Sequence, residues 1–116
     1  MAATFDVSSH FENRAPEVRA VYDRIVRAAR SLGKIQEDPK KTSIHLVHKT
    51  AFAGIATRKS ALILTLKSDE DIKSPRVVKR EKVSANRWHC EVRLEKPSEV
   101  DSEVKRWLKT AYELSS

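Results

Sequence analysis

The amino-acid sequence predicts a small α+β domain: an antiparallel sheet of about five strands with an N-terminal and a C-terminal helix packed on one face. Two stretches with helical periodicity, near residues 16–32 and 99–114, enclose a middle region whose segments resemble strands. Short connections between successive strands favour antiparallel pairing. Two amphipathic helices can cover one face of such a sheet. A chain of 116 residues fits a single domain, residues 1–116.

The first helix is predicted over residues 16–32. Pro16 suits the first helical position, where its missing N–H removes no hydrogen bond, and Gly33 favours a left-handed end to the helix. The apolar stripe along this helix consists of Val18, Val21, Tyr22, Ile25, Val26, Ala29 and Leu32. An irregular segment ahead of the helix holds three further apolar side chains that we expect to join the core, Phe5, Val7 and Phe11.

Five strands are predicted in the middle of the chain, at residues 42–49, 52–56, 61–67, 77–82 and 88–94. The third has apolar residues on both faces, which marks a central strand. Gly54, in the second, suggests a bend or a close approach of another backbone. The last strand alternates most clearly, and the side chains predicted to face the core are Trp88, Cys90, Val92 and Leu94.

The second helix is predicted over residues 99–114. Ser98 and Asp101, three residues apart, resemble a capping box at its start. Its apolar stripe consists of Val100, Val104, Trp107, Leu108, Ala111 and Tyr112.

Positive charge is concentrated between the two predicted helices. The formal net charge is +7, and residues 39–68 contain no acidic side chain. Such one-signed charge indicates either a solvated surface or an anionic partner. If the strands pair in chain order, several cations would converge on one face or rim of the sheet. The candidate anion-binding residues are Lys41, Arg58, Lys59, Arg76, Lys79, Arg80, His89 and Arg93.

Several classes of functional site find no support. The chain has only two glycines, so a glycine-rich phosphate loop is excluded. On a strand, His45 and His48 would point to opposite faces, and a zinc site would need more ligands than a chain with one cysteine offers. Cys90 is predicted to be a small buried hydrophobe rather than a nucleophile. We therefore predict no catalytic residue, no metal and no cofactor.

The cysteine content also bears on the cellular compartment. A single cysteine permits no internal disulfide, which suits a reducing cytoplasm. We see no secretory signal at the start of the chain. No apolar stretch approaches the roughly 20 residues that span a bilayer. A cytoplasmic protein without a membrane partner is therefore expected.

Several motifs together resemble a known bacterial and archaeal family, domain of unknown function 5655. They are IHLVHKTAFAGIATRKSALILTL, SPRVVK, KVSANRWHCEVRL and EVDSEVKRWLKTAY, which follow one another in this order. The resemblance covers nearly the whole chain. It implies the same one-domain fold and no catalytic residues.

Three functional hypotheses follow. The first is a non-enzymatic binding module with a basic face for an anionic partner, nucleic acid before other polyanions. The alternative is a protein-interaction or self-association module, in which an open sheet face pairs with a second copy to form a homodimer or with an acidic protein. The least favoured is an enzyme that uses His89, Arg93 and Arg76.

Overall fold

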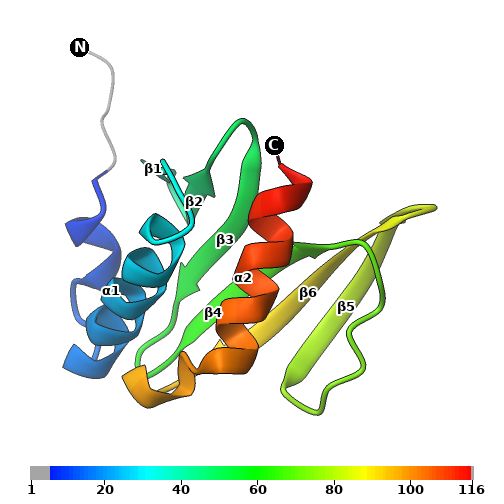
Figure 1. Cartoon of the computed structure of the whole chain (residues 1–116). Coiled ribbons are helices and arrows are strands. Elements are labelled where there is room, and N and C mark those ends of the chain that lie inside the picture. Colours follow the sequence, from blue (N-terminus) through cyan, green and yellow to red (C-terminus); the bar gives the residue numbers. More distant parts are fainter. Residues whose placement is uncertain (1–5, 116) are drawn as a thin grey trace.

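A computed structural model of the chain describes residues 6–115 as six strands and two α-helices (Figure 1). A 3-10 turn at Ser8–Phe11 precedes helix α1, Pro16–Arg30, and another at Pro97–Glu99 precedes helix α2, Ser102–Leu114. The strands are β1 Gln36–Pro39, β2 Ile44–Val47, β3 Ala51–Thr57, β4 Leu62–Ser68, β5 Val77–Ser84 and β6 Arg87–Leu94. The predicted α+β class with an antiparallel sheet is confirmed.

The sheet differs from the prediction in the number and order of its strands. All neighbours are antiparallel, in the order β1-β2-β3-β4-β6-β5. The extra strand is β1, whose sequence QEDP is polar and ends in proline, as is typical of an edge strand. Pairing in strict chain order was wrong at the last step, because β6 lies against β4 and displaces β5 to the other edge.

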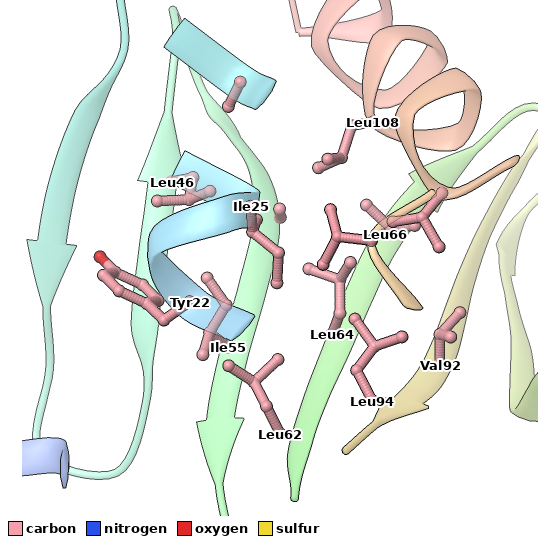
Figure 2. Packing of buried hydrophobic residues seen from close by; sticks show 14 of the residues in the cluster. Tyr22, Ile25, Leu46, Ile55, Leu62, Leu64, Leu66, Val92, Leu94 and Leu108 are labelled. Carbon is pink, nitrogen blue, oxygen red and sulfur yellow. The ribbon is translucent and has the colours of Figure 1, made fainter. Parts of the chain in front are cut away.

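Both helices cover the same face of the sheet (Figure 1), and the core lies between them and that face. Leu64 of β4 lies opposite Ile55 of β3 and Val92 of β6, and all three are almost fully buried. Figure 2 shows these side chains on the side of the sheet where Ile25 of α1 and Leu108 of α2 lie. The pattern predicted for β4 and β6 is confirmed, with Cys90 fully buried.

Apolar groups at the border of the core behave less uniformly. Trp88, predicted to face the core, packs against it but stays half-buried. Val7 and Phe11 also pack against the core, whereas Phe5 lies outside the described residues. Gly54 has ordinary spacing from its neighbours, since a Cβ there would lie 3.8 Å from Thr65. The expected close approach of another backbone at Gly54 is therefore wrong.

Both helices are shorter than predicted. Helix α1 ends at Arg30, and the chain then turns at Gly33, whose φ of +155° favours glycine. Helix α2 begins only at Ser102, because the preceding residues form a 3-10 turn. Asp101 caps it by accepting the N–H of Val104. The capping box predicted for Ser98 was thus wrong.

Edge strand β5 is guarded against pairing with another strand. Irregularities in its ladder fall at Val78 and Val83, which are the two large apolar side chains exposed within residues 6–115, at 58% and 44%. Between them lie only charged residues, the segment 79–82. Bulges and charge on an edge hinder edge-to-edge association.

Within residues 6–115, neither helix has the length and apolar character needed to cross a bilayer.

Candidate functional site

Three of the eight predicted anion-binding residues lie at one end of the sheet, which we call the turn end. Lys41 is in the β1–β2 turn, and Arg58 and Lys59 are in the β3–β4 turn. Antiparallel topology brings these two turns to the same end of their strands. All three side chains are exposed, and within the described chain none of them forms an ion pair.

Three others lie on the face of the sheet that the helices leave open. Lys79 is opposite Glu91, and His89 is opposite Glu81. The guanidinium of Arg93 pairs with Glu95 at 3.1 Å. The open face therefore carries both signs of charge, and its cations do not form a one-signed surface.

The remaining two, Arg76 and Arg80, turn toward carboxylates. Arg80 lies 2.7 Å from Asp71. Arg76 donates to Asp101 at 2.9 Å, to Glu103 at 3.2 Å and to the carbonyl of Glu99 at 2.7 Å. The eight residues are thus distributed over three regions. The group of His89, Arg93 and Arg76 is not assembled, because Arg76 reaches the start of α2 while His89 lies on the opposite face.

Arg76 therefore ties the start of β5 to helix α2, and we expect Arg76→Met to lower the free energy of unfolding by about 1 kcal/mol. Hydrogen bonds to charged groups contribute somewhat more than this when buried, but the carboxylates here are exposed enough for water to screen them. Urea denaturation at neutral pH measures the loss.

The same contact predicts a dependence on pH. Partial desolvation favours a higher pKa for Asp101, but the hydrogen bonds from Arg76 and Val104 outweigh it and hold the pKa below its ordinary value. A lowered folded-state pKa stabilises the fold above the unfolded pKa of about 3.9, and this contribution is lost as the pH falls through the folded-state pKa. The difference in the free energy of unfolding between wild type and Arg76→Met should therefore become smaller at acidic pH. A difference in the free energy of unfolding that is equal at neutral and strongly acidic pH contradicts this account.

The positive charge gathers instead in a hollow at the opposite end of the sheet. We call this the corner basin. It has a volume of about 830 Å³ and is built from the end of α1, the link to β1 and the β2–β3 turn. None of its lining residues is acidic; they are Arg30, Gly33, Lys34, Ile35, Gln36, Val47, His48 and Lys49.

The local chain explains this arrangement. The turn at Gly33 leads directly from α1 into β1, and pairing of Gln36 with Val47 places Lys34 beside the β2–β3 turn. Lys34 and Lys49 are both exposed, and no ion pair involves either of them among the described residues. Their ammonium groups therefore remain available to an anion.

The carboxylate of Glu37, which pairs with Arg30, also binds a second group. Glu37 accepts a hydrogen bond from the hydroxyl of Tyr22 at 2.5 Å and another from Arg30 at 3.1 Å. Burial and the hydrogen bond to Glu37 raise the pKa of Tyr22 far above its ordinary value, so the phenol stays protonated and keeps donating. Glu37 is thus fixed on Tyr22 and Arg30.

His48 lines the basin, and its ring belongs to an aromatic stack. The centroids of the His48 and Tyr112 rings lie 4.1 Å apart, with an angle of 19° between the ring planes. Tyr112 meets the buried ring of Phe52 edge-on at 5.5 Å. His45, three residues earlier, lines a different hollow on the open face. The two histidines therefore point to opposite faces, as predicted.

That second hollow is smaller, about 330 Å³, and it lies over the middle of the open face. Its floor includes Gly54 and Ala56, and His45, Lys67 and His89 stand around it. The ammonium of Lys67 donates to the hydroxyls of Thr50 and Ser115. Among residues 6–115, no group of three or more His, Cys, Asp or Glu side chains is placed to hold a metal ion.

Sequence reasoning missed the corner basin. Lys34 belongs to an N-terminal part with no net charge, and His48 attracted attention only as a possible metal ligand. The available signal was the acid-free run that contains His48 and Lys49. What could not be seen was the short strand β1, which brings Lys34 to that run.

Comparisons with known proteins give one result. The family model described as domain of unknown function (DUF5655) matches residues 7–115. Neither the search of curated proteins nor that of solved structures found a match.

Proposed function

The chain belongs to the domain of unknown function 5655 family, and since that membership assigns no activity, we propose that the domain is a non-enzymatic binding module that holds an anionic partner, nucleic acid first, in the corner basin. The observation that carries the proposal is the lining of that basin. Arg30, Lys34, His48 and Lys49 surround one hollow without an acidic neighbour in its wall.

The chemistry of these groups suits phosphate. A lysine ammonium is a mobile point charge, and an arginine guanidinium offers a planar set of donors. Within residues 6–115, Lys34 and Lys49 form no ion pair that binding would have to break, whereas Arg76, Arg80 and Arg93 do, as does Arg30 of the basin itself. This difference favours Lys34 and Lys49 over three of the eight residues that the sequence suggested, Arg76, Arg80 and Arg93.

An extended polyanion suits the surface better than an isolated small anion. Among residues 6–115, ion pairs engage only six of the 23 lysine and arginine side chains. The net charge of +7 would draw a polyanion toward the protein over a Debye length of about 10 Å at moderate salt. A long polyanion would find a second contact surface at the turn end, which consists of Lys41, Arg58 and Lys59.

Binding to nucleic acid should weaken steeply with salt. If three cations of the basin contact phosphates, the affinity for a single strand should fall with a log–log slope of about −2, which is roughly tenfold or more between 50 and 200 mM salt. Fluorescence anisotropy with a labelled oligonucleotide measures the slope, and retention on heparin provides a simple first test. Binding that does not change with salt, or no binding at low salt, would contradict the proposal.

A second candidate is a protein partner or a second copy on the open face. The observation that favours it is the uncovered sheet face with its hollow of about 330 Å³. Because bulges and charges on the edge strand β5 hinder pairing with another strand, the open face is the surface available to a protein partner. Light scattering at high protein concentration tests the homodimer: a dimer mass supports it, and a monomer mass excludes it.

A further inference from the structure

We infer that His48 is a base-stacking residue and that the partner is therefore single-stranded nucleic acid, an inference that rests on binding at the corner basin. The imidazole ring of His48 lies in the same hollow as several cationic side chains. His48 lines the basin together with Lys34 and Lys49, and Tyr112 covers one face of its imidazole.

The ring is held by Tyr112 on one face, and the backbone of its turn is fixed by a hydrogen bond. The ring of Tyr112 stacks on it with a centroid distance of 4.1 Å, and the buried ring of Phe52 packs against Tyr112 edge-on. The backbone N–H of His48 donates to the carbonyl of Thr50 at 3.1 Å, which fixes the turn. A ring whose orientation is fixed before binding loses little conformational entropy when a base stacks on it.

The cations that would bind the sugar–phosphate backbone lie close by. Lys49 follows His48 in the chain, and the backbone carbonyl of Lys34 accepts from the hydroxyl of Tyr112 at 3.5 Å. His48 and the two lysines therefore line one hollow. A base on the imidazole with phosphates beside the lysines satisfies both kinds of group at once.

This combination selects for an unpaired base. In a duplex the faces of the bases are stacked on one another, and only their edges are accessible in the grooves. Single-stranded nucleic acid exposes base faces, and proteins bind them on aromatic or histidine rings within a positively charged groove. Aromatic residues make up only 6% of this chain, and the stack at His48 supplies the platform that the composition does not suggest.

The test compares three probes by fluorescence anisotropy at one low salt concentration: an oligothymidylate, an abasic strand of the same length, and a duplex of that length. The abasic strand keeps the phosphates and lacks the bases. Wild type should bind the oligothymidylate about fivefold to tenfold more tightly than the abasic strand, the gain expected for one stacked base. His48→Ala should abolish this preference, and His48→Phe should retain it.

A matched control is His45→Ala, which removes the same side chain from the opposite face and should leave the preference unchanged. The inference is overturned if wild type binds both single strands equally, or if His48→Ala keeps the preference. The proposed function fails separately if Lys34→Glu with Lys49→Glu does not weaken binding of the abasic strand. Unchanged abasic binding by His48→Ala would show that the basin is still folded.

Discussion

Replacing Gly33 by alanine should lower the free energy of unfolding by about 2 to 4 kcal/mol. Two effects add at this position. A φ of +155° is a backbone conformation that residues with a side chain rarely adopt. The new Cβ would also collide with the hydroxyl of Tyr112 and would lie 3.2 Å from the ring carbon that carries it. Denaturation in urea, followed by circular dichroism, measures the loss.

A double-mutant cycle separates the two effects. Tyr112→Phe removes the hydroxyl, so Gly33→Ala in that background should cost about 1 kcal/mol less than in wild type. The rest of the cost arises from the backbone and should persist. An equal cost in both backgrounds would show that Gly33 and Tyr112 do not meet as described.

The fold was predictable where local pattern and burial agree. The strand β4 is apolar on both faces and β6 alternates regularly, and both lie in the centre of the sheet where these patterns have to be satisfied. The apolar stripes of the two helices similarly indicated which side faces the sheet. Ordinary amphipathic periodicity was therefore enough to give the fold class.

The edges of the sheet were not predictable in the same way. Strand β1 has no buried alternation, because Gln36 and its neighbours lie at an exposed edge. The order of β5 and β6 depends on the loop before Val77, which is held by contacts distant in sequence, such as that of Arg76 with Asp101. Such contacts leave no periodic signal in the chain.

The candidate site was predictable only in its charge. The excess of cations in the middle of the chain indicated either a solvated surface or an anionic partner, but the amino-acid order does not tell which cations will meet a carboxylate. Arg76 and Arg80 do so, whereas Lys49 meets no carboxylate in the part of the chain that the structure describes. The corner basin exists because β1 joins two segments that the sequence separates by more than ten residues.

Reversing the charge of Lys34 and Lys49 together should weaken binding to a single-stranded oligonucleotide by roughly 30-fold to 100-fold at low salt. Each substitution removes one attractive contact with a phosphate and adds a repulsive one. Both side chains are exposed, so the stability of the domain should change by no more than about 0.5 kcal/mol. Heat denaturation of the double variant checks that the fold is intact.

The most direct test compares this double variant with Arg58→Glu combined with Lys59→Glu. The two variants change the net charge equally, but Arg58 and Lys59 lie at the turn end, at the other end of strand β3. Any difference in their affinities therefore reports position rather than total charge. Anisotropy titrations should show a large loss for the corner variant and a small one for the turn-end variant. The reverse result, with the turn-end variant impaired and the corner variant binding like wild type, would contradict binding at the corner basin.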